Sequence, residues 1–127
     1  MRYMMMIKAT KDSEAGLPPS AALMAGMGKL CMEMAAAGKL LATDGLQPSS
    51  KATKITYSRG KRTVIDGPFT EAKEVIGGYA ILKADSKEEA LELAMKCVDV
   101  HIAAGVEVEL EMRPLSEPMS MGLDGKR

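Results

Sequence analysis

The sequence is poor in the side chains that most often mark a metal centre or an active site. Its 127 residues include no tryptophan, one phenylalanine, one histidine and two cysteines. Cys31 and Cys97 stand far apart and form no CxxC pair, so a zinc or redox motif of that kind lacks its ligands. With a single histidine, a metal site would need carboxylates or a second subunit, and we predict no metal.

Neither sign of charge is in excess, because seventeen basic residues balance seventeen acidic ones. A polyanion partner requires a basic stripe, and none is evident in the order of the residues. One phenylalanine and three tyrosines are too few for a platform on which bases stack. We therefore predict no nucleic-acid partner.

Long apolar runs are also absent. The apolar start over 3–7 is followed by Lys8 and is too short for a membrane span or a signal segment. Two isolated cysteines in such a chain are typical of reduced thiols, which predicts a cytoplasmic protein without a membrane partner. No GxGxxG, Walker A, GxSxG or HExxH motif is present, and we predict no bound cofactor.

The residues that are present describe one globular domain, with 46% hydrophobic and 27% charged residues. Periodicity and turn residues predict the order strand, helix, strand, hairpin, strand, helix, strand. The strands are expected over 2–9, 39–46, 54–58, 63–65, 78–83 and 106–112, and the helices over 18–38 and 86–105. The segment 11–16 is predicted to be a loop. Residues 1–116 form the predicted domain and 117–127 a flexible C-terminal tail.

Both predicted helices carry an apolar stripe at helical spacing. The first is expected to begin at Pro18-Pro19 and the second at a capping box, with Ser86 at the N-cap and Glu89 three residues later. The expected buried residues are Leu23, Met27, Leu30, Cys31 and Met34 in the first helix, and Leu91, Ala94, Met95, Val98 and Ile102 in the second.

This order of elements predicts an α+β fold, a ferredoxin-like split β-α-β with an inserted β-hairpin. Two helices cover only one face of such a sheet, yet the strands over 2–9 and 78–83 supply apolar side chains to both faces. A second copy of the same sheet is the simplest cover for the other face. We therefore predict a homodimer whose sheets pack face to face into a dimeric α/β barrel.

The stretch Asp66-Gly67-Pro68-Phe69 predicts a sharp corner after the hairpin. Asp66 can bond nearby backbone, Gly67 can adopt positive φ, and Pro68 restricts φ. Phe69 is expected to anchor the corner against the core. Gly77-Gly78 follows shortly before the next apolar strand.

These residues resemble a known family, the DGPF subgroup of the YciI-like (YCII-related) proteins. The resemblance is carried by the opening strand Arg2–Lys8, by the block from Asp66 through Glu71, Lys73-Glu74 and Gly77-Gly78-Tyr79, and by Asp99-Val100-His101 with Glu111–Pro114. It covers residues 1–116. It implies a dimeric ferredoxin-like barrel in a largely uncharacterised family. Related YciI proteins have a proposed histidine–aspartate active site with its histidine on the first helix, where this sequence has none.

Two residues are candidates for acid–base chemistry. His101 is the only histidine, the side chain that titrates nearest neutrality, and it alternatively satisfies carbonyls at a helix end. Asp66, if desolvated against Phe69, would hold a proton more tightly and act as a base; alternatively it only shapes the turn. Ligand contacts are predicted at Asp44, Phe69, Glu71, Lys73 and Arg113, where Arg113 would bind a carboxylate or pair across the dimer.

Two classes of function follow. The first is a small enzyme that uses a cleft for proton transfer, elimination or hydrolysis on a small polar metabolite. The second is a non-catalytic domain that binds a ligand or a partner. The resemblance adds that such a regulator would belong with sigma-factor systems, since DGPF proteins accompany extracytoplasmic-function sigma factors.

Overall fold

The computed structural model describes residues 1–69 and 75–116. The strands are β1 (Arg2–Lys8), β2 (Leu40–Gly45), β3 (Thr53–Ser58), β4 (Lys61–Asp66), β5 (Ile76–Lys83) and β6 (Leu110–Pro114). The helices are α1 (Lys11–Glu14), α2 (Ala21–Ala36) and α3 (Lys87–Ala103), with a 3-10 turn η1 (Ser49–Lys51). The predicted order of the main elements is confirmed.

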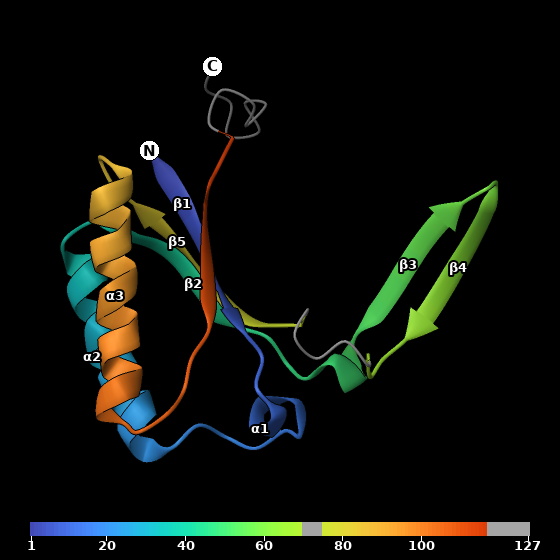
Figure 1. Ribbon diagram of the computed structural model, residues 1–127, viewed down its shortest axis with the longest axis horizontal. Helices are drawn as coiled ribbons and strands as arrows, with labels where there is room; N and C mark the ends of the chain where they lie inside the picture. Colours follow the sequence, from blue (N-terminus) through green and yellow to red (C-terminus); the bar gives the residue numbers. More distant parts are fainter. Residues whose placement is uncertain (70–74, 117–127) are drawn as a thin grey trace.

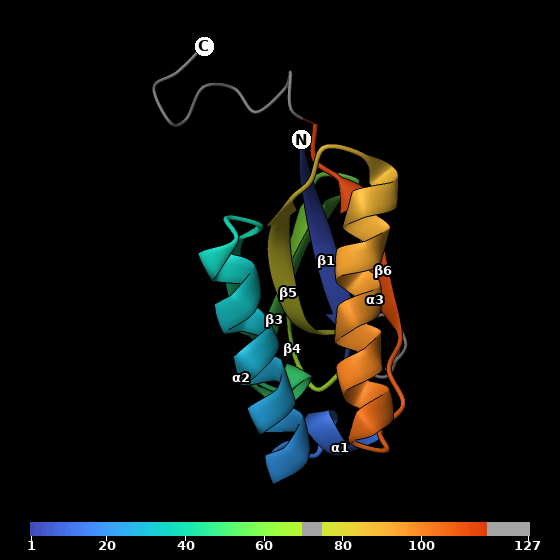
Figure 2. The same ribbon diagram turned by 90° about the vertical axis from the view of Figure 1, so that its left-hand side faces the viewer.

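Four strands form an antiparallel sheet in the order β2-β5-β1-β6, with α2 and α3 side by side on one of its faces (Figures 1 and 2). The core lies between this face and the two helices. Its buried members are Tyr3, Met5, Leu30, Met34, Ala80, Leu82, Ala84, Ala90, Leu93, Ala94 and Cys97.

The buried face of α2 agrees with the prediction, whereas that of α3 agrees only in part: Ala94 is buried as predicted. Leu91, Met95 and Ile102 are 47%, 52% and 67% exposed, whereas Leu93 and Cys97 are buried. The predicted and the buried stripes of the helix are offset by one position and share Ala94, and the stripe that also contains the small Ala90 faces the sheet. Small side chains allow the helix to approach the sheet more closely. The spacing of the apolar residues alone does not reveal which stripe makes that approach.

The start of α2 differs from prediction, and so does the segment that precedes it. Pro18-Pro19 precede α2, which begins after Ser20, whose hydroxyl accepts from the N–H of Leu23 at 3.2 Å. Residues 11–14, predicted as loop, form the one-turn helix α1, capped by Thr10. At α3 the Ser86 hydroxyl accepts from the Glu89 N–H as predicted, at 3.1 Å.

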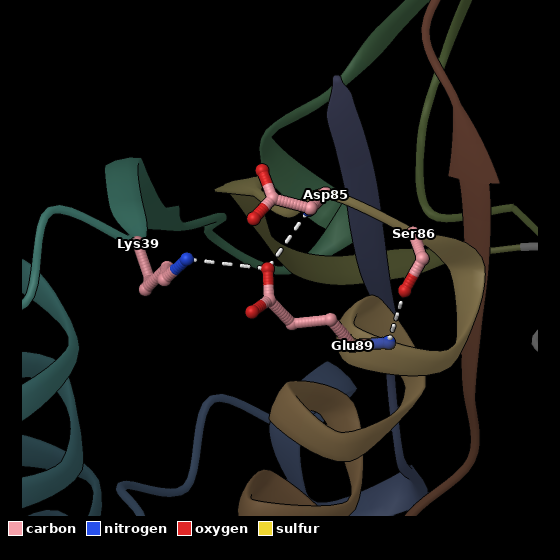
Figure 3. A network of polar contacts seen from close by, with 4 residues as sticks. All are labelled: Lys39, Asp85, Ser86 and Glu89. Atoms are coloured by element: carbon pink, nitrogen blue, oxygen red, sulfur yellow. Dashed lines mark hydrogen bonds and ion pairs between the residues drawn. The ribbon is translucent and has the colours of Figure 1, made fainter.

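The second half of the predicted capping box is wrong. The Glu89 carboxylate accepts from the backbone N–H of Asp85 at 2.8 Å and from the Lys39 ammonium at 3.2 Å (Figure 3). These two bonds lower the pKa of Glu89. The network links the start of α3 to the residue that precedes β2, and so to the β2 edge of the sheet.

Strands β3 and β4 form a separate two-stranded hairpin, which we call the arm. Its two-residue turn, Arg59-Gly60, has φ of 53° and 74°, the left-handed backbone that hairpin turns of this length require. The arm projects away from the sheet on the side that α2 and α3 leave open (Figure 1). The inserted hairpin is therefore confirmed.

The face of the sheet opposite the helices is apolar at its centre. Because Tyr3 and Met5 face the helices, Met4 and Met6 lie on the other face, where they pair with Ile81 and Tyr79 of β5. We call this surface the open face. Strand β6 begins only at Leu110, so the predicted strand over 106–112 starts too early.

Among the described residues, none of the helices combines the length and apolarity that crossing a bilayer demands.

Candidate functional site

The corner after the arm is held by a close backbone approach. A Cβ on Gly67 would lie 1.7 Å from the carbonyl oxygen of Ser49, and the Gly67 N–H donates to the Ala52 carbonyl at 2.9 Å. The Gly67–Pro68 peptide is cis, and Gly67 is not among the glycines with positive φ. Glycine is therefore required here by proximity, and the predicted positive φ is wrong.

Ser49 connects the corner to the N-terminal segment. This residue is 3% exposed, and its N–H and hydroxyl both donate to the carboxylate of Glu14, the N–H at 2.8 Å. The hydroxyl oxygen of Ser49 in turn accepts a hydrogen bond from the backbone N–H of Phe69 at 3.2 Å. The two bonds from Ser49 lower the pKa of Glu14, because they stabilise its charged form.

A pocket of about 460 Å³ opens beside this corner, and we call it the corner pocket. Its described walls are mainly apolar. The ammonium of Lys54 lies 4.5 Å from the centre of the Phe69 ring, a cation–π contact. Lys51 also lines the pocket, together with Gln47, Ser49 and the apolar residues Leu46, Pro48, Ala52, Phe69, Val75 and Ile76.

Phe69 has a different place from the one expected. The side chain is half-buried and stands outside the core cluster, so it does not anchor the corner against the core. The anchor is the bonding of Ser49 to Glu14 and to the Phe69 backbone. The Phe69 residue instead lines the corner pocket.

His101 lies in a second cavity of about 380 Å³, which shares the walls Leu46 and Pro48 with the corner pocket. His101 is 6% exposed, and its Nδ1 lies 2.8 Å from the Cys97 carbonyl. Since a carbonyl only accepts, Nδ1 is the donor in this contact. Burial, with a smaller contribution from Cys31, raises the pKa of the Cys97 thiol to about 11.

The predicted site residues do not converge. Asp66 is exposed at the base of the arm and accepts from the Thr53 hydroxyl at 3.2 Å; it lines neither cavity. Its exposure removes the desolvation on which a role as base depended. Asp44 pairs with Tyr79 on the open face. Arg113 lies across that face on β6, 3.9 Å from Glu111.

Glu71 and Lys73 lie outside the described residues, as does the tail 117–127. The sequence did not point to Lys51, Lys54 or Ser49 as site residues. The only available signal was the cluster of lysines in the polar segment before the hairpin, which is usually a solvated surface. In the part of the chain that the structure describes, no three His, Cys, Asp or Glu side chains gather where they could hold a metal ion.

The fold and the pocket define a class of small mixed α/β proteins with an antiparallel sheet, one helix-covered face and a pocket at one end of the sheet. The model of the YCII-related domain matches residues 1–114. The chain belongs to the YCII-related family, which confirms the resemblance seen in the sequence at the level of the family.

Two known proteins are similar to this chain. It is 35% identical over 80 residues to an uncharacterised protein of Rhizobium meliloti (strain 1021), a match that covers 63% of this chain and 62% of that protein. It is also similar to the solved structure of 5-chloro-2-hydroxyhydroquinone dehydrochlorinase from Burkholderia phenoliruptrix AC1100 in complex with 2,5-dihydroxybenzoquinone. That likeness covers 93% of this chain and 98% of the other, with 13% identity and a TM-score of 0.43. At this level it carries no conclusion about activity.

Proposed function

We propose that this protein binds a small organic anion with an apolar body, such as an aromatic or branched carboxylate, in the corner pocket. The observation that carries the proposal is the composition of the pocket wall. Six apolar residues surround a space of about 460 Å³, and two lysines stand among them. Apolar walls with a few charged groups are typical of small-molecule sites.

The charge of the lining favours an anion over a cation or a neutral molecule. Among the described residues of the wall, Lys51 and Lys54 are the charged ones and no carboxylate is present. The nearby Glu14 carboxylate is already bonded twice to Ser49. An aromatic ligand would also have the Phe69 ring as a stacking partner. The predicted polar metabolite is thus refined to one with a mainly apolar body.

We further propose that two copies pack through their open faces, as a cytosolic dimeric barrel of ferredoxin-like topology in the DGPF subgroup. The strand order β2-β5-β1-β6 supports the topology, and the unpartnered apolar centre of the open face supports the dimer. The Asp66–Phe69 block supports the subgroup, and two free cysteines support a reducing compartment.

The ligand proposal is tested by thermal shift and calorimetric titration with benzoate-type and branched aliphatic carboxylates, each beside its neutral amide. A ligand that binds only the folded state raises the melting temperature. We expect the acids to bind and the amides not to. Lys54→Gln should weaken binding by about tenfold, the magnitude of one lost charge-assisted contact. Lys61→Gln, on the same arm but outside the pocket, should leave binding unchanged. Equal binding of acid and amide would refute the anion site.

A second candidate function is acid–base catalysis at His101, favoured by its place in the wall of the second cavity and by the contact that orients its ring through Nδ1. A catalytic role of His101 would distinguish the enzyme hypothesis from that of a purely binding domain. His101→Gln should then abolish turnover of a bound acid while leaving its affinity in the corner pocket within about twofold. Turnover that survives His101→Gln would remove this residue from the chemistry.

A further inference from the structure

The arm is unusual because nothing in the described part of its own chain covers it. All twelve residues of β3 and β4 are exposed. Ile55, Tyr57 and Val64 are 71%, 72% and 64% exposed, although large apolar side chains in a two-stranded hairpin need cover to be stable in water. An exposed apolar patch on an isolated hairpin marks a surface that packs on something else.

The two faces of the arm differ in character. Ile55 and Val64 are directly paired, and Tyr57 lies beside them on the same face of the ribbon. The opposite face carries the pair Thr56 and Thr63 at its centre. Arg62 lies opposite Tyr57 on the first face, and Ile65 lies opposite Lys54 on the second. The first face is therefore the more apolar one and the second the more polar, an alternation typical of a sheet that contacts a partner on one side only.

The charges of the arm favour a second copy of this chain as that partner. Residues 53–66 contain four basic side chains and one acidic one, so the rest of the chain carries thirteen basic and sixteen acidic side chains. On the open face itself, Asp44 and Glu111 flank the apolar centre formed by Met6 and Tyr79. Glu111 is in turn 3.5 Å from Lys8 and 3.9 Å from Arg113, so Asp44 is the carboxylate of this pair that has no cation beside it among the described residues. The arm and the body are thus complementary in both charge and exposed apolar surface.

The placement of the arm agrees with the same partner. It leaves the molecule on the side of the open face, and its ribbon diverges from that of the sheet (Figure 1). A second sheet packed on the open face would lie beside the arm. Two-fold symmetry would then give each copy an arm that reaches the other.

We propose that the arm clasps the second subunit, its apolar face of Ile55, Tyr57 and Val64 packed against the partner. This inference rests on the dimer of the proposed function and adds the element that secures it. It also concerns the ligand site, because Lys54 belongs to β3 and lines the corner pocket. Docking of the arm would fix the position of that lysine.

The test compares two double variants within the arm by sedimentation velocity over a range of concentrations. Ile55→Glu with Val64→Glu places two carboxylates on the apolar face. Thr56→Glu with Thr63→Glu places two carboxylates at the directly opposite pair on the other face, with the same change of charge and the same cross-strand repulsion. We expect the first variant to weaken dimerisation by about 100-fold, the loss of two buried aliphatic side chains, and the second by less than about threefold.

Limited trypsin digestion supplies an independent measurement, because Lys54, Arg59, Lys61 and Arg62 are cleavage sites in the arm. In the wild type we expect cleavage there to slow as the protein concentration rises and the dimer forms. In the Ile55→Glu, Val64→Glu variant the rate should not depend on concentration.

Each other outcome overturns the inference in a distinguishable way. A wild-type dimer whose arm is cut equally fast at all concentrations would leave the sheet-to-sheet dimer intact and refute the clasp. A wild-type monomer would refute both the clasp and the dimer, while the acid-against-amide titration would still decide the ligand site. Concentration-independent cleavage that slows only with added duplex DNA would assign the arm to nucleic acid.

Discussion

At the scale of single residues, Gly67 shows how a backbone contact can dictate a side chain. A methyl group there would overlap the Ser49 carbonyl, a backbone atom that cannot rotate aside. We expect Gly67→Ala to lower the free energy of unfolding by about 1–3 kcal/mol through overpacking. Gly28→Ala is the matched control, since its Cβ would meet nothing within 4 Å and alanine is the better helix former. Urea denaturation of both variants measures the contrast, and equal stabilities would refute the contact.

Glu14 makes the stability of the folded protein depend on pH through its bonds at the corner. Its pKa is lowered in the folded protein by the side-chain and backbone bonds from Ser49, relative to an ordinary value of 4.5. A lowered carboxyl pKa contributes stability above the ordinary value, and that contribution is lost as the pH falls through the folded value. The difference in melting temperature between wild type and Glu14→Gln should therefore be largest near neutral pH and shrink below about pH 4.5. A difference that stays constant down to acid pH would contradict this account.

At the scale of elements, α3 carries two apolar stripes and buries only one. Leu93 is 7% exposed in the core and Leu91 is 47% exposed two positions earlier. We expect Leu93→Ala to cost about 2–4 kcal/mol, the usual loss for a core leucine, and Leu91→Ala to cost less than about 1 kcal/mol. The pair forms its own control, because residue type, helix and substitution are identical. A larger loss at Leu91 would restore the stripe predicted from the sequence.

At the scale of the whole molecule, the open face should decide the oligomeric state. Met6 lies at its centre, opposite Tyr79 of β5, and has no helix above it. Met6→Glu should therefore leave the subunit folded but convert the proposed dimer to a monomer, measured by sedimentation together with circular dichroism. Met24→Glu, at a 60% exposed position on α2, should remain dimeric. Dimerisation that survives Met6→Glu would place the interface elsewhere.

Much of the architecture was predictable because its signals are local. Gly38 and Gly105 end the two long helices with positive φ, Ser86 caps α3, and Arg59-Gly60 turns the hairpin. Each of these positions depends on backbone conformation within a few residues. The family was also recognisable from a compact block of spaced residues, and the match over 1–114 agrees with it.

The candidate site was much less predictable. Ser49 and Glu14 are separated by 35 positions, and Lys54 reaches Phe69 from across the hairpin. Nothing in the spacing of those residues indicates that they meet. Asp66 stood out as a polar residue at a turn. In the fold its side chain is exposed to solvent and accepts a hydrogen bond from the Thr53 hydroxyl.

By itself, the sequence determined the order of elements, the helix ends, the hairpin turn and the family, because propensity, capping and turn geometry act over a few neighbouring residues. Only the tertiary structure decided which stripe of α3 is buried, why Gly67 has no side chain and which residues surround the corner pocket. These depend on how closely segments distant in the chain can approach, and that distance is set by the packing of the whole molecule.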